Sequence, residues 1–409
     1  MWRMRGGFNR AVWWLAGLAA ALCLAGADRA AWTAQPEPHV TAVRLGEHPD
    51  KTRIVFDVTE KLDYRVFLLA DPYRVVIDLP ELTWEAPPPR EDGGVGLIKG
   101  YRFGLFAPGT WRVVLDVAQP VKIKEMRVIE PREGYRYRLV LDLAPETREA
   151  FLAETKRSAA AAAPAPAPVA PARPEPKPGK KVVVIDPGHG GVDPGALGRT
   201  GVYEKFLTLS MAGELKRALE SVGRYHVVLT RDRDIFLPLR ERIAIGRAAG
   251  ADLFISLHAD TIDDSRIRGL SVYTLSETAS DKEAAALAAS ANKSDVIAGV
   301  DLTNANPDVA NILIDLAQRE TMNLSANFAE FAVADLAREA ALLGKTHRFA
   351  GFAVLKAPDV PSVLVELGYL SNREDERQLR DPVYRGRLAA ALVKSVERYF
   401  AWKDGLSKS

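Results

Sequence analysis

Residues 182–195 read Val-Val-Val-Ile-Asp-Pro-Gly-His-Gly-Gly-Val-Asp-Pro-Gly, and this stretch decides the fold of the second half of the chain. Its first four residues are apolar and β-branched, which is typical of a strand buried on both faces of a sheet. The glycines and prolines that follow end the strand abruptly. The stretch therefore predicts a buried parallel strand and, after it, the kind of loop where α/β proteins carry their binding groups.

Strands and helices alternate from this stretch to the C-terminal end of the chain. We expect strands near residues 227–230, 253–257, 270–275, 352–355 and 363–367. We expect helices near residues 204–221, 238–249, 281–298, 316–343 and 382–402. This order predicts an α/β catalytic domain over residues 181–403, with a mostly parallel central sheet and flanking helices.

The first half of the chain has a different pattern, in which short runs alternate apolar and polar residues with a period of two. Three of these runs share one pattern, an arginine, three apolar residues and an aspartate: Arg53-Ile-Val-Phe-Asp57, Arg74-Val-Val-Ile-Asp78 and Arg112-Val-Val-Leu-Asp116. Residues 38–145 are therefore predicted to form a small all-β, sandwich-like domain. Residues 150–180 are rich in alanine and proline, which predicts a semi-rigid linker between the two domains.

The N-terminal end has the composition of an export signal. Arginines precede an apolar run of about 14 residues, shorter than the roughly 20 that span a bilayer, and the run ends in Ala25-Gly26-Ala27. Residues 1–27 are therefore predicted to be a signal peptide for the general secretory route, with an uncleaved anchor as the alternative. Cys23, the only cysteine, would be removed with it, so a metal site must use histidines and carboxylates. A net charge of +2 gives no reason to expect nucleic-acid binding.

Four polar side chains are expected at one edge of the predicted sheet. His189 follows the first strand, His258 follows the strand at 253–257, Glu204 opens a helix and Glu366 ends the last strand. Taken singly, each has an ordinary structural explanation; together, two imidazoles and a carboxylate match a catalytic zinc site with a position open for water. We therefore expect one Zn²⁺ held by His189, Glu204 and His258, with Glu366 moving protons between a zinc-activated water and a leaving amine.

The motifs of this half resemble a known family. Residues 186–196 and 365–372, with Glu204-Lys205, Thr230-Arg231 and Phe254-Ile-Ser-Leu-His-Ala-Asp260, are similar to the zinc N-acetylmuramoyl-L-alanine amidases of bacterial cell division. The resemblance implies the same three ligands and catalytic glutamate, acting on the bond between N-acetylmuramic acid and L-alanine of the peptidoglycan stem peptide. Residues 38–145 resemble the AMIN domain that precedes some of these amidases and targets them to peptidoglycan.

The resemblance also gives a meaning to residues 276–330. Some of these amidases carry an inserted helix here that covers the zinc and offers it a glutamate, until an activator protein with a degenerate LytM-type metallopeptidase domain displaces the helix. This chain has Ala291 immediately before Asn292-Lys-Ser-Asp295, where an acidic residue would stand in the family, so Glu283 and Glu277 are the candidate blocking residues. The alternative is a plain pair of surface helices.

These observations predict a periplasmic hydrolase that splits peptidoglycan at the division septum and has no membrane span after signal cleavage. One rival function is a zinc carboxypeptidase or endopeptidase that cuts within the stem peptide. Another is a wall-binding protein without activity, which would not need the ligand set or Glu366.

Overall fold

A computed structural model describes residues 37–89, 93–132, 134–161, 179–300 and 313–406. The predicted signal peptide at 1–27 and residues 162–178 of the predicted linker lie outside these ranges. From Pro38 onward the chain forms one compact unit.

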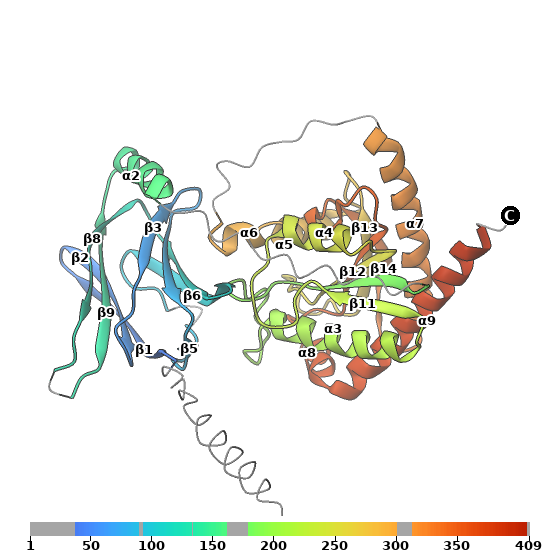
Figure 1. Cartoon of the computed structure of the whole chain (residues 1–409), viewed down its shortest axis with the longest axis horizontal. Coiled ribbons are helices and arrows are strands. Elements are labelled where there is room, and N and C mark those ends of the chain that lie inside the picture. Colours follow the sequence, from blue (N-terminus) through green and yellow to red (C-terminus); the bar gives the residue numbers. More distant parts are fainter. Residues whose placement is uncertain (1–36, 90–92, 133, 162–178, 301–312, 407–409) are drawn as a thin grey trace, which may run out of the picture. The chain divides into compact units, whose positions relative to one another are not determined.

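The N-terminal part is built from two antiparallel sheets (Figure 1). The five-stranded sheet has the order β5-β1-β2-β9-β8, in which only the short contact between β5 and β1 is parallel. The four-stranded sheet has the order β3-β4-β7-β6. The strands are β1 (His39–His48), β2 (Lys51–Val58), β3 (Arg65–Leu69), β4 (Arg74–Pro80), β5 (Thr83–Trp84), β6 (Ile98–Ala107), β7 (Thr110–Val117), β8 (Val121–Ile129) and β9 (Tyr137–Pro145). The predicted all-β domain is confirmed.

The core of this β domain follows from the alternation in its strands. In β2, every second residue is buried, and Ile54, Phe56 and Val58 are completely inaccessible. A helix that the sequence did not predict, α2 (Arg148–Ala161), adds Phe151 to the same core. The Phe151 ring lies 5.1 Å from that of Tyr73 in an edge-on contact. Residues 150–161 of the predicted linker are therefore helical, and the apolar ring of Phe151 anchors that helix.

The C-terminal part contains the predicted α/β sheet, with the strand order β11-β10-β12-β15-β13-β14. Its strands are β10 (Lys181–Pro187), β11 (Tyr225–Leu229), β12 (Leu253–His258), β13 (Leu270–Leu275), β14 (Leu342–Ala350) and β15 (Ser362–Glu366). All neighbours are parallel except β13 and β15, which makes the sheet mixed but mostly parallel, as expected. Because β10, β12 and β15 run in the same direction, their C-terminal ends meet at one edge.

Helices cover both faces of this sheet (Figure 1). One face, with Val183, Ile255 and Val365, packs against α3 (Glu204–Ser221), α7 (Leu313–Leu336) and α9 (Pro382–Leu406). The other, with Val184 and Phe254, packs against α4 (Leu239–Ala248) and α5 (Lys282–Ala291). The short helices α6 (Ser294–Ile297) and α8 (Arg373–Arg380) complete the domain. Burial on both faces explains the unbroken apolar strands of the sequence.

Two local predictions were wrong. The expected strand at 352–355 is a 3₁₀ helix, Ala353–Leu355, and the strand lies earlier, as β14. This strand pairs only with β13, at the edge of the sheet, so it can carry polar residues such as Lys345 and His347 that hide a strand pattern. The expected helix over 281–298 is broken into α5 and α6 around Asn292 and Lys293.

Within the described ranges, no helix is both long enough and apolar enough to span a membrane.

The burial of Phe151 gives a test of the helix that extends the β domain. We expect Phe151→Ala to lower the free energy of unfolding by about 3–5 kcal/mol, because it removes a fully buried ring and leaves a cavity. Urea unfolding followed by tryptophan fluorescence measures the change. Leu152→Ala, at the next and only half-buried position, is the control and should cost clearly less. Equal effects of the two substitutions would show that α2 is not anchored through Phe151.

Candidate active site

The four residues expected at the sheet edge come together there. His258 is the last residue of β12, Glu366 is the last residue of β15, and the two are direct partners in the register of the strands. His189 lies two residues beyond β10, and Glu204 is the first residue of α3. All four side chains are buried. The parallel strands therefore place His189, His258 and Glu366 at one edge of the sheet, and the start of α3 adds Glu204, as the sequence predicted.

His189, Glu204 and His258 form one tight group. Each offers a possible metal-binding atom, and these atoms all lie within 4.8 Å of one another. The two imidazole rings are 4.9 Å apart and nearly perpendicular. Glu204 lies between them, with Oε1 3.0 Å from Nδ1 of His258 and Oε2 3.1 Å from Nε2 of His189. Backbone amides of Ala259 and Ala196 each donate to one of these oxygens at 2.9 Å, which fixes the carboxylate.

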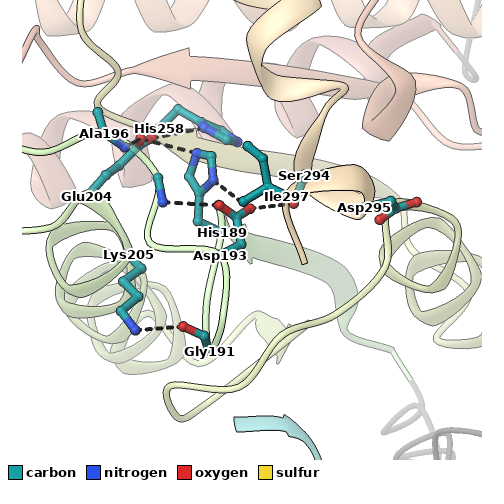
Figure 2. Close-up of polar contacts among 12 residues, drawn as sticks. His189, Gly191, Asp193, Ala196, Glu204, Lys205, His258, Ser294, Asp295 and Ile297 are labelled. Carbon is teal, nitrogen blue, oxygen red and sulfur yellow. Dashed lines mark hydrogen bonds and ion pairs between the residues drawn. The ribbon is translucent and has the colours of Figure 1, made fainter. Parts of the chain in front are cut away.

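A carboxylate that the sequence analysis did not single out orients His189. Nδ1 of His189 lies 2.9 Å from Oδ2 of Asp193, and both residues are buried (Figure 2). Nε2 is therefore the nitrogen left to face Glu204. Histidines that bind metals usually place a carboxylate or carbonyl on the other ring nitrogen. The His-x-x-x-Asp spacing within one tight loop was the available signal for Asp193.

The loop that carries His189 is strained and tightly held. His189 has φ +61°, a left-handed conformation that a non-glycine residue adopts only when its surroundings impose it. Two buried arginines impose it: Arg242 donates to the carbonyl of His189 at 2.8 Å, and Arg231 donates to that of Gly188 at 2.8 Å. Gly188 has no room for a side chain, because a Cβ atom there would lie 2.5 Å from the ring of His258.

The charges of the group favour a bound cation. Burial alone would raise the pKa of Glu204, but the adjacent imidazoles hold it well below its ordinary value. Burial likewise lowers the pKa of His189, yet Asp193 and Glu204 outweigh burial and raise that pKa well above normal. Both shifts arise because one buried carboxylate, Glu204, lies between two imidazoles.

Glu366 has the opposite electrostatic setting. Burial raises its pKa well above the ordinary value, and the carboxylates of Asp260 and Glu204 raise it further. The backbone amide of Asp260 donates to Oε2 of Glu366 at 3.2 Å and orients the group. Burial and the nearby Glu204 raise the pKa of Asp260 itself to about 6. Asp260 is thus a second acid beside Glu366, half-buried, that the sequence analysis did not single out, although it lies only two residues after His258.

The inserted segment reaches this site through α6. The hydroxyl of Ser294 donates to the same oxygen of Asp193 that contacts His189 (Figure 2). A small pocket is lined by Ala291, Asn292 and Ser294 of the inserted segment together with His189 and His258. Part of the segment therefore forms one wall of the site.

The candidate blocking residues Glu283 and Glu277 lie elsewhere in this structure. Glu283 is on α5, and its carboxylate is 3.6 Å from the guanidinium of Arg348. Glu277 is exposed in the loop before α5. Neither belongs to the group of potential ligands found among the described residues. Residues 301–312 of the same segment are outside the described ranges.

Comparisons with known proteins agree with this architecture. A family model described as N-acetylmuramoyl-L-alanine amidase (Amidase_3) matches residues 183–398, and a model described as AMIN domain matches residues 42–143. The chain is 34% identical over 381 residues to the N-acetylmuramoyl-L-alanine amidase AmiC of Neisseria meningitidis serogroup B, covering 88% of this chain and 90% of that protein. It is also 34% identical over 377 residues to AmiC of Escherichia coli O6:H1, covering 88% and 89%.

Among solved structures, the chain resembles the N-acetylmuramoyl-L-alanine amidase AmiC2 of Nostoc punctiforme. The two are 28% identical, the match covers 55% of this chain and 98% of that one, and the TM-score is 0.39. The family-model match extends over more than half of the chain, and the two AmiC relatives align over nearly its whole length. The chain therefore belongs to the Amidase_3 family of N-acetylmuramoyl-L-alanine amidases.

Proposed function

We propose that the chain is a zinc enzyme that hydrolyses the amide bond between N-acetylmuramic acid and the L-alanine of the peptidoglycan stem peptide. The observation that carries this proposal is the group of His189, Glu204 and His258, with its possible ligand atoms within 4.8 Å of one another. Membership of the amidase family supports the substrate. Two imidazoles and one carboxylate are a usual donor set for a hydrolytic zinc that keeps a position open.

The residues present fit a divalent cation. Nε2 of His189 is buried and makes no hydrogen bond, although it lies 3.1 Å from Oε2 of Glu204. A cation shared between these atoms would satisfy both, and Asp193 already holds the ring in the orientation that exposes Nε2 to Glu204.

In the proposed hydrolysis, the zinc ion and the side chains of the protein have separate tasks. When bound, Zn²⁺ would lower the pKa of a water from 15.7 toward about 7 and polarise the scissile carbonyl. Glu366 accepts a proton in its carboxylate form and returns it to the leaving amine, a role suited to a buried carboxyl group with a raised pKa. Arg231 and Arg242 keep the His189 loop fixed, so that the geometry does not need to form during the reaction.

Two substitutions separate metal binding from proton transfer. We expect Glu366→Gln to keep one zinc per chain but to lower the rate of hydrolysis by about 10²–10⁴-fold, because the proton carrier is lost. His189→Ala should lower both the zinc content and the rate. Metal analysis of the purified variants and dye release from labelled sacculi give the two readouts.

The exposed His48 on β1 provides the control, since His48→Ala should change neither zinc content nor rate. Activity of the wild type should fall as the pH is lowered through the raised pKa of Glu366, because protonation removes the base. Hydrolysis that survives unchanged in Glu366→Gln would rule out this role for the residue. Zinc well below one per chain, together with dye release from the wild type no higher than from sacculi alone, would favour a wall-binding protein without activity.

The products of digestion test the bond that is cut. We expect purified sacculi to release intact stem peptides that begin with L-alanine, since the amidase reaction separates the whole peptide from the glycan. Mass spectrometry of the soluble fraction identifies the new N-terminus, and Glu366→Gln provides the background digest. Release of terminal D-alanine, or of peptides cut internally, would instead identify the carboxypeptidase or endopeptidase alternative.

We further propose that the inserted segment around residues 276–330 restrains the enzyme, and that an activator with a degenerate LytM-type metallopeptidase domain releases it at the septum in the periplasm. The contact from Ser294 to Asp193 and the pocket wall formed by Asn292 and Ser294 support the restraint. Asp295 also accepts a hydrogen bond from the backbone of Leu239 at 3.0 Å. A blocking carboxylate from Glu283 or Glu277 would require the segment to move, because Glu283 contacts Arg348 here.

Removal of the segment tests the restraint. We expect deletion of about residues 281–314 to raise hydrolysis of sacculi without any activator, because it removes one wall of the site. Dye release and zinc content are measured together, and circular dichroism establishes that the variant is folded. If a folded, zinc-loaded deletion variant is no faster than the full chain, the segment does not restrain the enzyme.

A further inference from the structure

The four-stranded sheet of the β domain carries an unusual group of arginines on one face. Two of the repeated sequence runs lie on neighbouring antiparallel strands, and their register places Arg74 opposite Asp116 and Arg112 opposite Asp78. Arg112 donates to Asp78 at 2.6 and 2.9 Å, and Arg102 on β6 pairs with Asp116. Asp78 and Asp116 therefore hold the guanidinium groups of Arg112 and Arg102 in place. Arg74 and Arg112 are themselves buried.

These arginines bind the C-terminal end of α6. Arg74 donates to the carbonyl of Val296, and Arg102 donates to that of Ile297 at 2.5 Å. Arg112 donates to the carbonyls of Ala298 and Gly299, at 3.4 and 2.9 Å. Four successive carbonyls thus face three cations. The last carbonyls of a helix lack partners within the helix and carry partial negative charge, so guanidinium groups are well suited to them.

Apolar packing completes the contact. Val76 and Val114 of the β domain share a buried cluster with Ala298 and with Val192 and Phe236 of the catalytic domain. Gly299 has φ +70°, and a Cβ atom there would lie 3.2 Å from methyl groups of both Val76 and Val114. Glycine suits this position for two reasons, the left-handed backbone and the close approach.

The same short segment is attached to the metal site at its other end. Ser294 binds Asp193, the carboxylate that orients His189, while residues 296–299 bind the β domain. Only one residue separates the two sets of contacts. Because α6 is a single short turn, its two ends cannot easily move independently.

We propose that the arginine face of the β domain, formed by Arg74, Arg102 and Arg112, holds α6 in its position beside the metal site, and so acts as the second half of the restraint on hydrolysis. This inference rests on the proposed restraint by the inserted segment. The domain expected to bind the wall is then also a regulatory element. Release of the site requires α6 to leave both Asp193 and the arginine face.

Two substitutions in the full-length, zinc-loaded chain test this. Arg102→Gln removes a cation from Ile297 without altering the segment, and Gly299→Ala introduces a methyl group against Val76 and Val114. Hydrogen–deuterium exchange of peptides covering 294–299 reports the attachment of α6, and dye release from sacculi without activator reports the restraint. We expect exchange and hydrolysis each to increase about tenfold, the scale of losing one charge-assisted hydrogen bond.

Gly250→Ala is the matched control. It has a similar left-handed backbone, φ +64°, but no atoms close to the added methyl group, so it imposes the strain without touching the β domain. It should leave both readouts at the level of the wild type.

The outcomes separate this inference from the proposed restraint. If deletion of about residues 281–314 raises hydrolysis but Arg102→Gln and Gly299→Ala change neither readout, the restraint stands and the role of the arginine face is wrong. If the two substitutions speed exchange, yet neither they nor the deletion raise hydrolysis, the restraint itself is wrong and this inference fails with it.

Discussion

The buried ion pair between Asp186 and Arg242 is the interaction on which the site depends. Both side chains are 1% exposed, and their closest atoms are 2.9 Å apart. Asp186 also accepts hydrogen bonds from Thr230 and Ser256, at 2.6 and 2.8 Å, so one carboxylate ties together β10, β12 and the end of β11. Arg242 extends the network to the carbonyls of Pro187 and His189.

Burial of such a pair is costly unless every polar group finds a partner. Here burial alone would raise the pKa of Asp186, but Arg242 and the two hydroxyl groups hold it below the ordinary value. The carboxylate therefore stays charged, and Arg242 can stabilise the left-handed backbone of His189. The backbone geometry of His189, two residues after β10, is thus imposed by a buried ion pair that packs beneath it.

The features that repeat along the chain could be predicted from the sequence, and those that depend on tertiary contacts could not. Apolar runs bounded by glycine and proline located β10 and β12, and parallel topology then brought His189, His258 and Glu366 to one edge. The pairing of Asp193 with Ser294, by contrast, joins residues far apart in the sequence. The strand β14 was misplaced because an edge strand needs little apolar character, and α2 was missed because one phenylalanine anchors an alanine-rich helix.

The arginine face binds the main chain of residues 296–299 rather than the side chains of Val296 and Ile297. Arg74 and Arg102 bind the carbonyls of Val296 and Ile297, whose own side chains are only half-buried. Substitutions at these two positions therefore leave the hydrogen bonds to the carbonyls in place, whereas a Cβ atom at Gly299 would lie 3.2 Å from Val76 and Val114. The attachment of α6 to the β domain thus depends little on which side chains stand at positions 296 and 297.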